Sequence, residues 1–400
     1  MEISLSIQLL LTLFICLVSS FIISFFFNKL KLPRVLGPLI VGLVLNIMLS
    51  DLFVLIPEFL NIVEIFANLG ILLSLFYLGL KIDFETAKPL TKHSFITAIN
   101  TTFFPFILGM LTTYFFGYGL LTSFLVGVFL TVTAEEVSLT ILDDLNLVKK
   151  KIGNIIIEAG TIGNIFEVII IALIGLEIKS LIIVPSGNLL AGILSELFIF
   201  VIIISFSRFI LVPLFFDALG VKPKSYEIFF VCFIVLNVLS LTSDILNFGN
   251  IIGALLAGLI VKDYLIIKKI KINLQRIIEV TETVNYSIFE PMTFIWVGIL
   301  INPDFLTNPY FGIVLTIIAL FGKLIGAVVG NILYKKSIRE GLIIGWGLNS
   351  RGSTELFAIL IAKKAGLIHN SVYNAVVIMA VLTTFISPIV FEKLARDYLG

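Results

Sequence analysis

Hydrophobic side chains follow one another along this chain in long runs that are separated by short polar joints. Runs of about 20 residues recur from one end to the other, and each is long enough to cross the hydrocarbon core of a bilayer as a helix. The joints contain Pro, Gly and charged residues, as in KLKLPR (29–34) and GVKPKS (220–225). The pattern predicts thirteen spans, at about 4–27, 33–50, 60–82, 92–117, 120–142, 151–177, 189–216, 224–246, 249–266, 280–301, 308–334, 338–362 and 371–394. We therefore expect an all-α protein that crosses the membrane many times.

The composition supports a membrane protein and argues against several other classes. Of the 400 residues, 59% are hydrophobic and 13% are charged, whereas soluble domains have about 25% charged residues. The first span lacks a basic leading segment, so we expect no cleavable signal peptide. A net charge of +1 indicates no nucleic-acid partner. The chain has no nucleophile–base set and no nucleotide-binding loop, so we expect neither an enzyme nor a cofactor.

Lysine and arginine lie mostly on one side of the predicted membrane. The joints after odd-numbered spans and the C-terminal end contain 21 of the 27 basic residues, and the opposite joints contain only Lys179, Lys363 and Lys364. Cytoplasmic loops are enriched in Lys and Arg. The asymmetry predicts an external N-terminus and a cytoplasmic C-terminus. The remaining three basic residues, Arg208, Lys323 and Arg351, fall inside spans.

Polar residues interrupt two of the predicted spans near their middles. The fifth contains TVTAEEVS (131–138) and the twelfth contains GLNSRGSTEL (347–356). Broken helices at corresponding places in two halves are typical of transporters built from inverted repeats, whose solute site lies at the breaks. The halves are then about 1–180 and 222–400, joined by a linker helix at 189–216. In the alternative interpretation, these polar residues only bind neighbouring helices to one another.

Two adjacent glutamates in the first interruption favour a solute site. Glu135 and Glu136 lie at bilayer depth in the predicted fifth span. A charged carboxylate there costs about 2.5–3.5 kcal/mol even on lenient scales, and such residues are usually functional.

Seven segments in order make the chain similar to a known superfamily. Each segment alone is a weak signal, but their order extends over nearly the whole sequence. They are VLGPLIVGLVLN (35–46), NLGILLSLFYLGLKID (68–83), TVTAEEVSLTILDDLNLVKKKIG (131–153), IIGALLAGLIV (251–261), MTFIWVGILI (292–301), GLNSRGSTELFAIL (347–360) and VLTTFISPIV (381–390). With these segments the chain resembles the monovalent cation:proton antiporters of the Kef type and of the plant cation/H+ exchanger type.

The resemblance implies a fold and an activity. The fold is about thirteen transmembrane helices in a single transmembrane domain, with inverted repeats and two crossed broken helices. The activity is exchange of Na+, with Li+ or K+ as alternatives, for H+ across the cell membrane by alternating access. It also implies a homodimer whose moving core consists of about 92–177 and 308–394.

One position departs from the pattern of that superfamily. Its members usually have an ion-binding Asp in the sixth span, where this chain has Asn164. An amide oxygen can bind a cation, but the side chain cannot exchange a proton. Glu167 lies about 60° from Asn164 around the helix, whereas Glu158 lies about 180° from Glu167. We therefore expect Glu167 to titrate, and Glu158 to serve helix packing or to pair with a base such as Lys323.

Oxygen atoms from both spans make up the expected site for the transported cation and proton, because hard cations prefer oxygen ligands. The expected ligands are Thr131, Thr133, Glu135, Glu136, Asn164 and Glu167.

Further charges are expected to support this site. Related antiporters have a core lysine at the position of Lys323 that pairs with a carboxylate, and for Lys323 a role in stabilising crossed helices and a role in coupling are equal alternatives. Arg351 and Glu355 have the spacing of an i,i+4 ion pair, for which we favour a structural role.

Two other functions remain open from the sequence. The first is a K+ efflux or K+/H+ exchange system, although such systems usually have a large nucleotide-binding domain. The second is a sensor or channel-like homologue without coupled exchange, which the Asn at position 164 allows.

Overall fold

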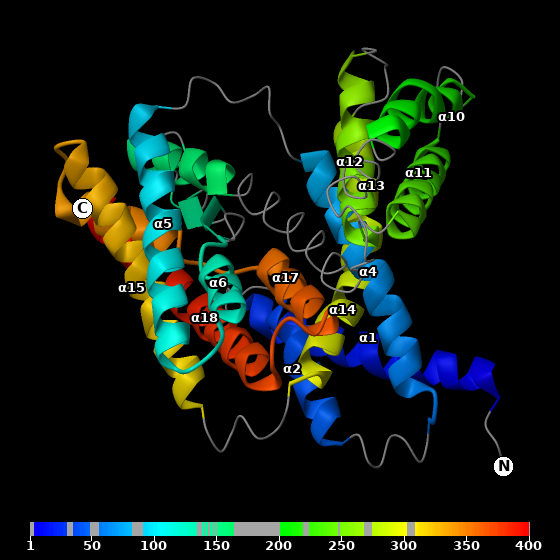
Figure 1. The fold of residues 1–400 in the computed structure, drawn as a ribbon, viewed down its shortest axis with the longest axis horizontal. Coiled ribbons are helices and arrows are strands. Elements are labelled where there is room, and N and C mark those ends of the chain that lie inside the picture. Colours follow the sequence, from blue (N-terminus) through cyan, green and yellow to red (C-terminus); the bar gives the residue numbers. More distant parts are fainter. Residues whose placement is uncertain are drawn as a thin grey trace, which may run out of the picture. The chain divides into compact units, whose positions relative to one another are not determined.

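The described part of the chain is helical throughout. The computed structural model describes residues 4–29, 35–48, 56–81, 91–133, 138–139, 141–142, 145, 147–148, 150–163, 201–218, 224–246, 249–267, 274–301 and 309–399, and no β-strand occurs in these ranges. The α-helices (Figure 1) are α1 (Leu5–Lys29), α2 (Leu36–Ile47), α4 (Phe59–Lys81), α5 (Lys92–Phe115), α6 (Leu120–Phe129), α10 (Val212–Ala218), α11 (Ser225–Ile245), α12 (Asn250–Ile267), α13 (Leu274–Val284), α14 (Glu290–Ile299), α15 (Tyr310–Leu333), α16 (Ile338–Gly347), α17 (Ser353–Lys364) and α18 (Asn370–Leu399). The other helical residues are two π-helical turns, η1 (Ser207–Leu211) and η2 (Asn285–Phe289), and the α-helical residues 138–139, 141–142, 151–163 and 201–206.

Seven helices within the described ranges are long and apolar enough to cross a membrane. Many of their large apolar side chains are exposed, among them Phe14 and Phe21 on α1. This is the arrangement that a lipid environment requires, because a helix satisfies its backbone internally and presents apolar side chains outward. The protein is thus an all-helical, multi-pass membrane protein. The total of thirteen spans stays a prediction.

Most helix ends agree with the sequence pattern to within a few residues, but the helix of the tenth span begins earlier than predicted. This helix begins at Leu274, in α13, and continues through η2 into α14. The first turns of α13 combine apolar residues with Gln275, Arg276 and Glu279. Hydropathy alone excludes such an amphipathic stretch, which is why the predicted start at 280 came too late.

The second predicted interruption is a helix break, and the first coincides with a helix end. Helix α16 ends at Gly347 and α17 begins at Ser353, so 348–352 are not helical. Helix α6 ends at Phe129, and residues 130–133 after it are not helical. Asn, Ser and Gly in the second stretch, and Thr in the first, are poor helix formers, which explains why the helices stop there.

The chain divides into two compact units. Unit 1 comprises 1–17, 55–83 and 172–296, and unit 2 comprises 18–54, 84–171 and 297–400. The end of α6 and the break between α16 and α17 both belong to unit 2.

Unit 2 contains a close helix pair, α5 and α15, which lie side by side (Figure 1). The contact runs along a stripe on α15 made of Gly322, Gly326 and Gly330, which we call the glycine stripe. A Cβ at these positions would lie only 2.7–2.9 Å from a backbone Cα of α5, those of Pro105, Thr101 and Thr97 respectively. Any larger residue would push the helices apart, because small residues are what allow two membrane helices to touch backbone to backbone.

Unit 1 also contains glycines at close helix contacts. Gly79 on α4 and Gly258 on α12 face each other, and a Cβ on Gly258 would lie 2.9 Å from the Cα of Gly79. In both units, therefore, glycines set the distance between the central helices.

Candidate functional site

The site in unit 2 begins at the C-terminal end of α6. The last carbonyl groups of a helix have no partner inside it, and together they form the negative end of the helix dipole. Here the chain leaves the helix after Phe129 while it is still buried, since Leu130, Thr131, Val132 and Thr133 are at most 6% exposed. These carbonyl groups therefore need donors from elsewhere in the protein.

Lys323 on α15 supplies one donor. Its side chain is 2% exposed, and its ammonium donates to the carbonyl oxygen of Thr131 at 2.6 Å and to the Thr133 hydroxyl. These contacts place the Lys323 ammonium at the end of α6, and its role in stabilising crossed helices or in coupling stays a prediction. They also bring Thr131 and Thr133, two of the expected cation ligands, to the same ammonium group.

Arg351, from the break between α16 and α17, supplies the other donors. Its guanidinium is fully buried and donates to the carbonyl oxygens of Leu130 at 2.8 Å, Val132, and Phe129 at 3.4 Å. The Thr384 hydroxyl on α18 donates to the carbonyl oxygen of Arg351 at 3.1 Å, which fixes the backbone from which the side chain extends.

Four consecutive carbonyl oxygens, those of residues 129–132, thus accept hydrogen bonds from two buried cationic side chains. The positive charges of Lys323 and Arg351 lie at the negative end of the α6 dipole, where they are stabilising. The same oxygens are the ligands that a desolvated monovalent cation requires, and freed carbonyls at a helix break provide such ligands in transporters. The arrangement is a row of four carbonyl oxygens at the end of a helix, each of which accepts a hydrogen bond from Lys323 or Arg351.

Direct hydrogen bonds join the second break to its surroundings. We call the non-helical residues 130–133 after α6 the first break. The hydroxyl of Ser138, which follows the first break in the chain, donates to the carbonyl oxygen of Gly347 at the end of α16. The Asn349 amide donates to the carbonyl oxygen of Leu320 on α15 at 3.0 Å. Neither residue was predicted from the sequence as part of the site. Asn349 lies inside the second polar interruption (347–356), so it had a signal, whereas nothing in the sequence distinguishes Ser138 from any other serine in a polar stretch.

Glu355 lies in the first turn of α17 and forms the predicted i,i+4 pair with Arg351. Its carboxylate is fully buried, and Oε2 is 3.8 Å from Arg351 Nε. That distance is too long for a hydrogen bond. Among the described residues neither carboxylate oxygen of Glu355 has a hydrogen-bond partner.

Glu158 does not pair with Lys323, which was one of the two roles expected for it. Its carboxylate accepts from the Thr91 backbone N–H at 3.2 Å and from the Thr91 hydroxyl at 3.1 Å. Thr91 is the N-cap of α5. The predicted pairing of Glu158 with Lys323 is wrong, because its carboxylate binds this cap while the Lys323 ammonium binds the first break. The other expected role, in helix packing, agrees with the contact to α5.

Four expected site residues fall outside the described residues: Glu135, Glu136, Asn164 and Glu167. Their roles stay predictions from the sequence. Of the other expected site residues, the structure brings Thr131, Thr133, Lys323, Arg351 and Glu355 together and places Glu158 at the start of α5.

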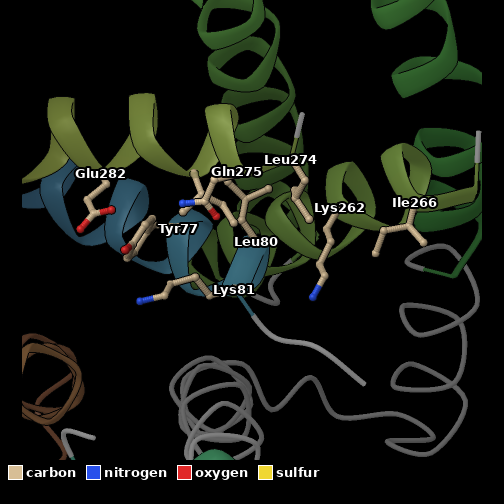
Figure 2. Close-up of a pocket in the computed structure, with 9 residues that line it drawn as sticks. Tyr77, Leu80, Lys81, Lys262, Ile266, Leu274, Gln275 and Glu282 are labelled. Atoms are coloured by element: carbon tan, nitrogen blue, oxygen red, sulfur yellow. The ribbon is translucent and has the colours of Figure 1, made fainter. Parts of the chain in front are cut away.

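Unit 1 contains a pocket of about 450 Å³. Figure 2 shows its polar side chains, which include Lys81 from α4, Lys262 from α12, and Gln275 and Glu282 from α13. The Lys81 ammonium lies 4.9 Å from the centre of the Tyr77 ring, within the range of a cation–π interaction. None of the residues expected at the ion site lines this pocket.

Similarity to characterised proteins extends over nearly the whole chain. The sequence pattern of the family described as sodium/hydrogen exchanger, transmembrane, matches residues 13–396. A Na+/H+ antiporter of Enterococcus hirae is 29% identical, over 95% of this chain and 96% of the relative. The Na+/H+-K+ antiporter GerN of Bacillus cereus is 27% identical, over 90% of this chain and 89% of the relative.

The chain is also similar to a longer relative and to a solved structure. Cation/H+ antiporter 17 of Arabidopsis thaliana is 26% identical, and this chain spans 47% of its length. The structure of the sodium proton antiporter MjNhaP1 from Methanocaldococcus jannaschii has the same fold, with a TM-score of 0.63 at 18% identity over 98% of this chain and 100% of that chain. The expected superfamily is confirmed: the chain belongs to the family of transmembrane sodium/hydrogen exchangers.

Proposed function

We propose that the chain is a secondary antiporter that exchanges Na+ for H+ across the cell membrane by alternating access, and that it is not an enzyme. The observation that carries this proposal is the row of four buried carbonyl oxygens, 129–132, held by Lys323 and Arg351. Oxygen atoms aligned at the end of a half-helix are suitable ligands for a small cation. When no ion is bound, the positive charges of Lys323 and Arg351 compensate the partial negative charge of these oxygens. The names of the Enterococcus and Bacillus relatives support Na+ as the cation.

The proposed site combines the described break with the carboxylates predicted from the sequence. Thr131 and Thr133 contribute oxygens at the break, Glu135 and Glu136 follow them, and Asn164 and Glu167 approach from the sixth span. We propose Glu167 as the group that exchanges the proton. The moving core consists of about 92–177 and 308–394, and the protein works as a homodimer.

Reconstitution in liposomes tests the exchange. Adding Na+ or Li+ to acid-loaded proteoliposomes is expected to discharge the pH gradient, read with a pH-sensitive dye, while vesicles without protein keep it. A channel is distinguished because it carries current without obligatory proton movement. If no monovalent cation discharges the gradient anywhere in the neutral pH range, the antiporter proposal is wrong.

K+/H+ exchange is the second candidate function. A K+/H+ antiporter of Saccharomyces cerevisiae is 26% identical over 90% of this chain, which spans 43% of the length of that relative. The same liposomes decide between the two cations, since K+ as the better substrate would favour this candidate.

Topology is a separate prediction. A reporter fused after Gly400 is expected to read as cytoplasmic and one before Met1 as external, because 21 of the 27 basic residues lie in joints on one predicted side. Accessibility of the two fusions in intact cells measures this. Two ends on the same side would remove one span and contradict the inverted-repeat arrangement.

A further inference from the structure

The carboxylate of Glu355 has no hydrogen bond to stabilise its charge among the described residues at the break. It is fully buried, and neither of its oxygens has a hydrogen-bond partner among the described residues. A carboxylate without hydrogen bonds in an interior without water is costly, and so is the loss of one partner of a buried pair. A structural ion pair would instead be closed, with the guanidinium bonded to the carboxylate.

The chain offers a direct comparison. Arg396 and Glu392 on α18 have the same residue types and an i,i+4 spacing, and their N–O distance is 2.6 Å. Between Arg351 and Glu355 the corresponding distance is 3.8 Å. The difference follows from where Arg351 directs its donors, since its guanidinium nitrogens bind the carbonyl oxygens of Phe129, Leu130 and Val132.

Opposing effects act on Glu355. Burial without hydrogen bonds favours its neutral form. The charge of Arg351, the nearby cationic Lys323 on α15 and the N-terminal end of the α17 dipole all favour its charged form. Of the other helices in contact with α17, α6 contains no ionisable side chain and α18 brings the Thr384 hydroxyl to Arg351. Opposing effects of this kind allow a group to bind and release a proton.

We propose that Glu355 binds a proton during the transport cycle and thereby decides where Arg351 bonds. With Glu355 protonated, the guanidinium stays on the carbonyl oxygens of the first break, as the structure has it. When Glu355 releases its proton to the solution, its carboxylate draws the guanidinium across the gap that now measures 3.8 Å. The oxygens of Leu130 and Val132 are then free to bind the transported cation.

This inference rests on the proposed exchange and adds a second proton site to it. In this scheme the proton binds Glu355 and the cation binds the carbonyl oxygens. The two therefore compete through the position of the Arg351 guanidinium and share no ligand at this site. Glu355 is a positioning residue in this scheme, because it acts on the cation through the guanidinium.

Glu355→Gln tests the proposal, because the amide keeps the shape and never becomes charged. The guanidinium then stays on the carbonyl oxygens, so the KM for Na+ is expected to rise and cation-driven proton exchange to fall by at least about tenfold. Melting in detergent is expected to match the wild type, since a neutral side chain replaces a neutral one. The matched control is Glu392→Gln, which removes the exposed pair on α18 and is expected to leave the KM and the pH profile unchanged.

A second variant covers the case in which Glu355→Gln fails to fold. Glu355→Asp keeps a titratable group but moves it away from Arg351 by one methylene, so its exchange is expected to have a shifted pH profile. Wild-type KM and pH profile in Glu355→Gln overturn the inference, and so does an unshifted profile in Glu355→Asp. After either of these results, the proposed function still holds if the wild-type protein exchanges Na+ for H+. A wild-type protein that exchanges no cation overturns both the proposed function and this inference.

Discussion

Replacing Arg351 with glutamine is expected to cost about 3–5 kcal/mol of unfolding free energy, as the loss of one partner from a buried charged network does. The guanidinium supplies donors to three carbonyl oxygens at the first break and is the partner of the buried Glu355. Glutamine is too short to replace these bonds, so buried acceptors lose their donors. Thermal melting of the purified protein in detergent measures the loss.

Two further variants separate the contributions of charge and of hydrogen bonding to the unfolding free energy that is lost in Arg351→Gln. Lys323→Met removes the donor to Thr131 and Thr133 while it keeps an apolar stem, so a smaller loss of about 1.5–3 kcal/mol is expected. Combining Arg351→Gln with Glu355→Gln is expected to cost no more stability than Arg351→Gln alone, because the protonated Glu355 has no charge that the loss of Arg351 leaves unpaired. An Arg351→Gln protein that melts like the wild type would show that the guanidinium contributes nothing to the break.

The second large effect concerns the exchanged proton. Glu167→Gln is expected to abolish coupled exchange, because Asn164 cannot carry a proton and Glu167 is the carboxylate nearest to it around the predicted helix. The measurement is cation-driven discharge of the pH gradient in liposomes. Normal exchange in Glu167→Gln, with none in Glu135→Gln or Glu136→Gln, would place the proton on the first broken helix instead.

Glu158→Gln is the matched control for this series. Glu158 lies on the same predicted span, but its carboxylate binds the N-cap Thr91 of α5. The amide oxygen of glutamine can still accept one of these bonds, so exchange is expected to continue and stability to fall by at most about 1 kcal/mol. Loss of exchange at both positions would mean that the two glutamates belong to one site.

The sequence predicted those features of the fold that depend on neighbouring residues. Apolar runs located the helices, and Gly, Asn and Ser located the break at 348–352. The i,i+4 spacing of Arg351 and Glu355 predicted their pairing, although Arg351 lies in the break before α17 and only Glu355 lies on the helix. Such signals are local, so a single sequence contains them.

Contacts between distant segments had no such signal. Nothing near Arg351 shows that its guanidinium reaches carbonyl groups about 220 positions earlier, because backbone oxygens are present at every residue. Likewise, the sequence predicted either helix packing or pairing with a base for Glu158, and only the fold places Thr91 beside it. The resemblance to antiporters identified Lys323 as a core residue, but its bonds to the first break are visible only in three dimensions.

The glycine stripe has a consequence for the response to membrane voltage. Lys323 directly follows Gly322 on a helix whose backbone touches that of α5, so its charge has little freedom to move along the membrane normal without both helices. If the core moves as proposed, the ammonium travels with the carbonyl oxygens that it binds. An elementary charge carried across the full membrane potential is worth about 2.3 kcal/mol per 100 mV. Each movement of the core then has a voltage-dependent contribution from a lysine that never leaves the protein.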